Sequence, residues 1–187
     1  MKPLRSMILF MAAILAYPAQ PSLAQEKGKT QASELASASQ KALSQLQAEA
    51  PLAKELTPKA HAILVFPKVK KAGFVVGGQY GEGSLLMQGK AAAYYKTTGA
   101  SFGMQAGGQE YGYAMYFMNA KALADLDNAK GFEVGVGPSI VMVDEGMAKT
   151  TTTNTLKDDI YAFVFGQKGL MAGLGLQGSK IAKITPK

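Results

Sequence analysis

His61 is the chain's one histidine, and the sequence contains no cysteine. Zinc sites use several His or Cys ligands, and a nucleophilic triad needs a histidine held between a carboxylate and a hydroxyl. His61 follows Pro58-Lys59-Ala60 at the start of an apolar segment, without a motif that would bring a nucleophile beside it. We therefore predict no catalytic residue, no metal site and no cofactor.

Two adjacent acidic pairs, Asp144-Glu145 and Asp158-Asp159, are the other residues that could do acid–base chemistry or bind a hard cation. Neighbouring side chains of a strand point to opposite faces, and a calcium ion needs more oxygen ligands than either pair supplies. The first pair precedes Gly146, as in a turn, and the second precedes an apolar segment. We therefore expect chain turns and strand ends here, and a protein that is not an enzyme.

Lysines form the densest charge cluster of the sequence. Three of them follow Phe66-Pro67, and two more lie shortly upstream. Each lysine near an anionic membrane contributes about 1 kcal/mol of attraction, although lysines in a turn between strands are commonly just solvated. The cluster is the predicted binding site for anionic lipid. Its residues are Lys54, Lys59, Lys68, Lys70 and Lys71.

Residues 1–24 have the pattern of a secretory signal peptide. Lys2 and Arg5 precede the apolar run 7–17, and Ser22-Leu23-Ala24 resembles a cleavage site. That run is too short for a helix to cross a bilayer core of about 30 Å. Because the sequence has no cysteine, it has no lipoprotein attachment site. We expect cleavage near Ala24 and a periplasmic or secreted location.

The remaining residues, 25–187, are enough for one domain with a substantial core. The formal net charge of the full chain is +7, and a modest positive field favours anionic partners such as acidic lipid headgroups. An exported protein is not expected to bind nucleic acid. We predict one domain, with a helix over about residues 30–50 and a β-rich core over about residues 61–185.

Apolar residues recur at helical spacing over residues 30–50, and Pro51 ends that pattern. From residue 62 the chain changes to short β-type runs broken by Gly, Lys and Thr, which predicts an antiparallel meander. Asn119 is a candidate N-cap for a short helix near 120–128. The predicted fold is α+β, with a mainly antiparallel, glycine-rich, barrel- or sandwich-like sheet. Its strands are expected at 62–66, 73–80, 84–88, 92–97, 101–108, 112–118, 132–136, 140–143, 159–165, 170–176 and 181–184.

The spacing Gly-x-x-x-Gly occurs four times in the predicted strands. Residues four apart lie on the same face of a strand, so we expect one sparsely covered face, called here the glycine face. Such glycines allow close approach of another backbone, a sharp coil or a ligand. We hypothesise that the helix over residues 30–50, whose surface is rich in Ala and Ser, covers part of this face. The pairs are Gly73/Gly77, Gly103/Gly107, Gly131/Gly135 and Gly169/Gly173.

Several stretches of the sequence form a further pattern. The first joins Ile63-Leu64-Val65-Phe66-Pro67 to the run from Lys71 to Gly83. The second is the run from Thr98 to Gln109, the third is Glu133-Val134-Gly135-Val136-Gly137, and the fourth is the run from Gly169 to Lys180. In this order they resemble the SYLF domain family, over about residues 32–185.

The resemblance implies a lipid-binding domain without enzymatic activity. Eukaryotic SYLF domains recognise phosphoinositide (phosphatidylinositol) membranes through an amphipathic N-terminal segment, and some also bind actin. The counterpart here, residues 30–56, has a narrow apolar stripe without aromatic residues. An exported bacterial protein is not expected to meet actin, and its lipid would be another anionic lipid or a host membrane.

Two functions follow. The first is recognition of anionic, phosphoinositide-like lipid or membrane surfaces through the five lysines. The alternative is a structural or protein-interaction module of the cell envelope, which would use strand edges or the glycine face to bind an envelope protein.

Overall fold

The computed structural model describes residues 30–127, 132–133, 140–143, 157–169 and 179–186. The signal-peptide prediction, the strand predicted at 170–176, most of the strand predicted at 132–136, and the glycines Gly131, Gly135 and Gly173 lie outside the described residues.

The N-terminal helix forms as predicted. The helix α1 (Gln31–Glu49) begins after Thr30, whose side chain accepts a hydrogen bond from the backbone N–H of Ser33, and it buries one narrow stripe of residues. Pro51 then starts the short helix α2 (Pro51–Leu56), where its missing N–H costs no hydrogen bond. The two helices therefore present one shared apolar face. The buried residues are Ser39, Ala42, Leu43, Leu46, Leu52, Ala53 and Leu56.

Two very long strands replace the six short strands predicted between residues 62 and 118. The strands β1 (Ala62–Met87) and β2 (Lys90–Phe117) pair antiparallel along almost their whole length. Gln88 and Gly89, both with positive φ, form the two-residue turn between them. The prediction of separate strands was wrong because a glycine inside a strand keeps its backbone N–H and C=O groups. These groups can still form hydrogen bonds with the neighbouring strand. Gly73, for example, keeps its register with Gly107.

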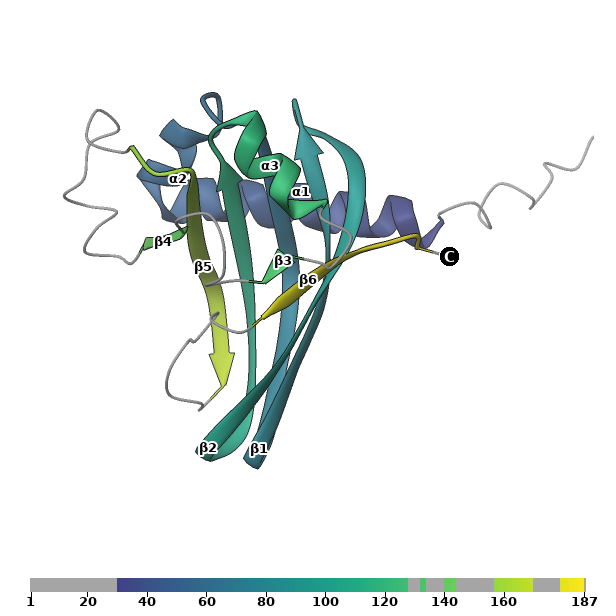
Figure 1. Cartoon of the computed structure of the whole chain (residues 1–187), viewed down its shortest axis with the longest axis vertical. Coiled ribbons are helices and arrows are strands. Elements are labelled where there is room, and N and C mark those ends of the chain that lie inside the picture. The colour runs from purple at the N-terminus through teal and green to yellow at the C-terminus, as the bar shows by residue number, and fades with distance from the viewer. Residues whose placement is uncertain (1–29, 128–131, 134–139, 144–156, 170–178, 187) are drawn as a thin grey trace, which may run out of the picture.

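The β1–β2 ribbon folds back on itself at its lower end in Figure 1. A Cβ on Gly81 would lie 2.7 Å from Cγ2 of Val69, and one on Gly83 would lie 2.8 Å from Cδ1 of Phe66, so the two halves of β1 are in contact. The Oη of Tyr111, opposite Val69, donates a 3.0 Å hydrogen bond to Oε1 of Gln79 in the returning half. Glycine is therefore needed where one half of the ribbon approaches the other.

The regular glycine face is not present at the described pairs. A Cβ on Gly73 would overlap Cα of Gly77, so the chain bends sharply between them. Gly107 has φ +128°, and no atom of the described residues, α1 included, lies within 4 Å of a Cβ built on it, so the hypothesis that α1 covers it was wrong. Instead, α1 packs on larger side chains, and its Ser39 hydroxyl contacts Ser84 at 3.2 Å. The sharp coil, one of the expected uses of these glycines, is what the structure contains.

The remaining strands complete one sheet around β2. β5 (Ile160–Gly169) pairs antiparallel with the end of β2, and β6 (Lys180–Ile184) pairs antiparallel with its beginning. β3 (Phe132–Glu133) pairs with β6, and β4 (Ile140–Val143) runs parallel to β5. The order is β3-β6-β2-β5-β4, with β1 beside β2. The α+β class and the mainly antiparallel sheet are confirmed, and within the described residues the sheet is open rather than closed into a barrel.

The short helix α3 (Ala120–Leu126) forms where it was predicted. The Oδ1 of Asn119 accepts a 2.8 Å hydrogen bond from the N–H of Ala122, which caps the helix. Ala122 and Leu126 join an apolar cluster that links both halves of the ribbon. A second cluster packs α1 and α2 against the other face of β1, β2 and β5. The sheet is therefore apolar on both faces where its strands are longest.

Substitution of Gly83 tests the close approach of the two halves of β1. In Gly83→Ala the new methyl group would meet the carbonyl of Val65 and the ring of Phe66, so we expect a loss of about 2 kcal/mol of unfolding free energy. Gly78→Ala is the matched control, because its methyl would lie 3.8 Å from its nearest neighbour. Urea unfolding followed by circular dichroism measures both. Equal stabilities of the two variants would contradict the packing described here.

Candidate lipid-binding surfaces

The five lysines predicted to bind lipid lie in separate places. Lys54 is exposed on α2, and Lys59 is exposed in the turn before β1. Lys68 and Lys70 are exposed on β1, about 20 Å further along at the usual rise of a strand. Lys71 is only 5% exposed. The structure therefore does not bring the five side chains together on one surface.

Lys71 faces the interior because of the register of β1. An irregularity between Phe66 and Val69 resets the alternation of the strand, and Val69 then joins the apolar cluster inside the ribbon. Lys71, two residues later, lies on the same side as Val69, opposite the buried Gln109 of β2. The prediction that Lys71 belongs to an exposed basic patch is corrected by this placement.

A compact basic surface is formed instead by three neighbouring strands. Lys70 of β1 pairs in register with Glu110 of β2, and Glu110 pairs with Lys168 of β5. The Nζ of Lys68 lies 3.2 Å from Oε1 of Glu110. We call Lys68, Lys70, Lys168 and Glu110 the lysine cluster. It carries three positive charges around one carboxylate, and all three lysines are exposed.

Lys168 was missed by the sequence analysis. It is an isolated lysine between Gln167 and Gly169, far from the other members of the cluster in sequence. Only the pairing of β5 with β2 brings it beside Glu110. The strand predicted at 159–165 ended before Lys168, so no feature of the sequence linked this residue to the lysines of β1.

A cleft borders the lysine cluster, and an exposed tyrosine lies on the returning half of β1. A small cleft of about 140 Å³ lies between the sheet and α1, and Glu110 and Lys168 line it together with Gln45 and Pro67. Tyr80 is 51% exposed and precedes Gly81, the residue that contacts Lys68 and Val69. The hydrogen bond from Tyr80 to Glu82 raises the pKa of the phenol above its ordinary value. Tyr80 is therefore an exposed phenol on the returning half of β1, which points away from Val69 because Gly81 faces that residue.

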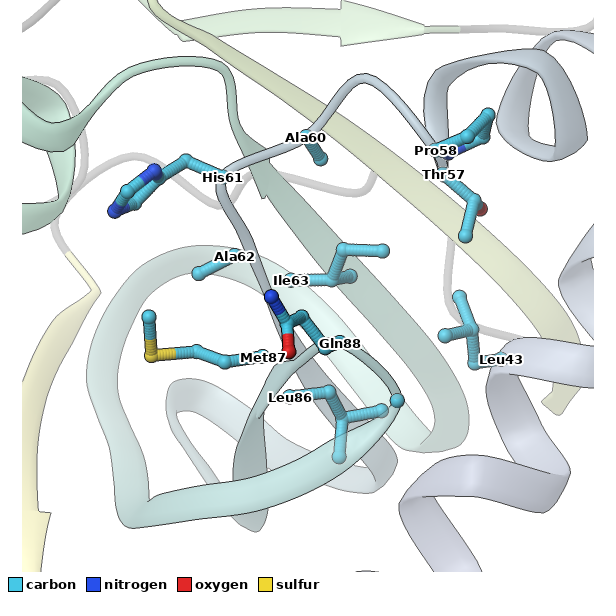
Figure 2. A pocket seen from close by; sticks show the side chains of 11 residues that line it. Leu43, Thr57, Pro58, Ala60, His61, Ala62, Ile63, Leu86, Met87 and Gln88 are labelled. Carbon is cyan, nitrogen blue, oxygen red and sulfur yellow. The ribbon is translucent and has the colours of Figure 1, made fainter.

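A larger groove opens at the other end of β1 (Figure 2). Its volume is about 680 Å³, and three segments line it: α1, the stretch between α2 and β1, and the β1–β2 turn. Leu43, Ile63 and Leu86 are among its apolar lining residues. The hydroxyl of Thr57, which also lines the groove, already donates to the carbonyl of Ala53 and accepts from Nε2 of Gln47. We call this space the hairpin groove.

Basic residues flank the hairpin groove. Lys59 lies between the lining residues Pro58 and Ala60, and Lys90 directly follows the lining residue Gly89; both are exposed. His61 lines the groove at the end away from Leu43 (Figure 2). Lys59 therefore belongs to the neighbourhood of this groove and not to the lysine cluster, whereas Lys54 lies on α2.

Among the residues that the structure describes, no group of His, Cys, Asp or Glu side chains could hold a metal ion. In the same part of the chain, no helix has the length and apolar character needed to cross a membrane.

Residues 98–185 match the family model Ysc84, which is described as Las17-binding protein actin regulator. This match covers a little under half of the chain, and over those residues the chain is similar to the Ysc84 (SYLF) family. The match starts within β2 and includes Glu110 and Lys168, whereas Lys68 and Lys70 precede it. A comparison with curated proteins gave no match. The SYLF resemblance seen in the sequence is confirmed by this family match.

Measurements of unfolding free energy test whether Lys71 is buried while Lys70 is exposed. Lys71→Glu places a new negative charge in the interior beside Gln109, so we expect a loss of about 3 kcal/mol of unfolding free energy. Lys70→Glu puts a second carboxylate opposite Glu110 on an exposed surface, and its cost should stay below about 1 kcal/mol. Denaturant titrations of both variants give the difference. Similar losses would show that Lys71 is not in the interior.

Proposed function

We propose that this SYLF-family protein is a non-enzymatic module that binds anionic lipid at a membrane surface through the lysine cluster. The observation that supports the proposal is the cross-strand register of Lys70, Glu110 and Lys168, with Lys68 beside them. Strands of one sheet hold the four side chains on one face. A headgroup phosphate could then contact two or three lysines without first ordering a loop.

The expected energetics are those of a peripheral protein. Each lysine near an anionic surface contributes about 1 kcal/mol, and Glu110 offsets part of that attraction. Binding of this kind is weak for a single headgroup and increases with the negative charge of the surface.

The cellular setting remains the one proposed from the sequence. Residues 1–24 direct the chain out of the cytoplasm, so the lipid is a periplasmic or extracellular anionic lipid, chemically similar to phosphoinositides in its clustered negative charge. The family model's description names an actin regulator. Because an exported bacterial protein would not meet actin, we propose that the lipid partner, rather than actin, is the one relevant here.

A vesicle experiment tests the lysine cluster. The protein should sediment with vesicles rich in phosphatidylserine, should stay in solution with pure phosphatidylcholine, and should be released by salt because exposed charges are screened. The triple variant Lys68→Glu, Lys70→Glu and Lys168→Glu should bind the anionic vesicles at least tenfold more weakly, at about 1 kcal/mol for each lysine.

The control for this experiment carries the same change in net charge elsewhere. Lys41, Lys121 and Lys157 are exposed and lie outside the cluster, so their triple glutamate variant should retain most of the binding. If the two triple variants lose affinity equally, net charge and not the cluster directs binding. If the cluster variant binds like the unmodified protein, the proposed site is wrong.

The second candidate is a protein-interaction module of the cell envelope. One specific observation favours it: in the described residues, β4 pairs with β5 along one edge only, and its Met142 is 41% exposed. An open strand edge with an apolar side chain can add a strand from a partner. Association that depends on protein concentration, without affinity for lipid, would favour this function over the first.

A further inference from the structure

The hairpin groove has the chemistry of a site for a single lipid molecule, separate from the membrane surface proposed above. We propose that it binds the alkyl chain of a long-chain fatty acid, with the carboxylate near Lys59 and Lys90. The proposed ligand is a dissolved molecule. The groove that would bind it lies at a different end of β1 from the lysine cluster. It can therefore fail or succeed independently of membrane binding.

The groove is preformed, because hydrogen bonds fix the three segments that make it. Nε2 of Gln40 on α1 donates a 2.8 Å bond to the carbonyl of Gly89 in the β1–β2 turn. The N–H of His61 donates a 2.8 Å bond to the carbonyl of Phe117, which ties the start of β1 to β2. A ligand would therefore enter a space whose walls are already ordered, which lowers the entropic cost of binding.

The lining favours an alkyl chain over a polar molecule. Most lining side chains are apolar, and the hydroxyl of Thr57 is occupied by protein partners. A polar group beside these side chains would lose its hydration for few hydrogen bonds in return, whereas an alkyl chain loses nothing of this kind. The apolar lining residues are Leu43, Pro58, Ala60, Ala62, Ile63, Leu86 and Met87.

The size of the groove suits one ligand molecule. Its volume of about 680 Å³ lies within the range of roughly 300–1,000 Å³ that is usual for small-molecule sites. A concave space of this size, formed between a helix and a hairpin turn, cannot receive the flat surface of a bilayer. A single amphiphile, with an alkyl chain and one polar end, therefore fits this groove better than a membrane surface does.

The lysines near the groove favour an amphiphile whose polar end is negatively charged, such as a carboxylic acid. Lys59 and Lys90 are both exposed and follow lining residues from two different segments. Within residues 54–61 and 86–90, Lys54 adds a third cation and Glu55 is the one acid. The side-chain amide of Gln88, another lining residue, is a possible hydrogen-bond donor to a carboxylate (Figure 2).

Displacement of a fluorescent probe tests the proposal. The protein, as isolated from a bacterial expression host, is titrated with dansyl-labelled undecanoic acid, and unlabelled palmitate is then added to displace it. We expect saturable binding of the probe and full displacement by palmitate. Ala60→Trp fills the groove from its half-exposed wall, and the variant should bind at least tenfold more weakly.

Two further variants test the position of the carboxylate and the independence of the groove from the lysine cluster. The double variant Lys59→Glu and Lys90→Glu should bind palmitate about fivefold more weakly, as expected for two exposed ion pairs, and should bind a fatty alcohol with unchanged affinity. The cluster variant with glutamate at Lys68, Lys70 and Lys168 should bind palmitate like the unmodified protein. Thermal melting of each variant confirms that it is folded.

Absence of palmitate displacement would overturn the proposal, and so would unchanged binding by a folded Ala60→Trp variant. If the lysine double variant lost affinity equally for the fatty acid and for the fatty alcohol, the assigned position of the carboxylate would be wrong. Vesicle sedimentation of Ala60→Trp should stay unchanged. Loss of vesicle binding in that variant would mean that the groove is part of the membrane surface and not a separate site.

Discussion

The contact between the two halves of β1 is the constraint on which the rest of this structure depends. A strand of 26 residues would otherwise extend far beyond the helices that cover it. The missing side chains at Gly81 and Gly83 let the returning half lie directly against Lys68–Val69 and Val65–Phe66. Because the ribbon doubles over, β2 can pair with β5 near its end and with β6 near its beginning, and all described strands join one sheet.

The same folding separates the two candidate surfaces. The alternation of β1, reset between Phe66 and Val69, directs Lys68 and Lys70 outward and Lys71 inward. Glu110 then lies between lysines from two neighbouring strands and reduces their mutual repulsion. The hairpin groove, in contrast, depends on the β1–β2 turn and its hydrogen bond to Gln40. One surface is set by cross-strand register, and the other is set by the docking of a helix on a turn.

The sequence predicted local features well and long-range features poorly. Pro51 and Asn119 act on their immediate neighbours, so the end of α1 and the start of α3 were located closely. The length of β1 and β2 was missed, because glycine weakens a strand without removing the backbone groups that pair with a partner strand. Lys168 was missed because its role arises from the pairing of β2 with β5, which depends on the tertiary fold. Lys71 was misplaced because Pro67, which has no N–H, was read as the end of a strand, whereas it lies in the bulge that reverses the alternation of β1.

The family match begins at residue 98, in the middle of β2, and this start has a consequence for how the protein can be divided. A fragment excised at that point would carry the recognisable half of the domain without β1, α1 or α2. Its Tyr116 and Phe163 would be uncovered, and β2 would present a bare hydrogen-bonding edge. Such a fragment would aggregate rather than fold, so the boundary of the recognisable sequence is not the boundary of the cooperative unit.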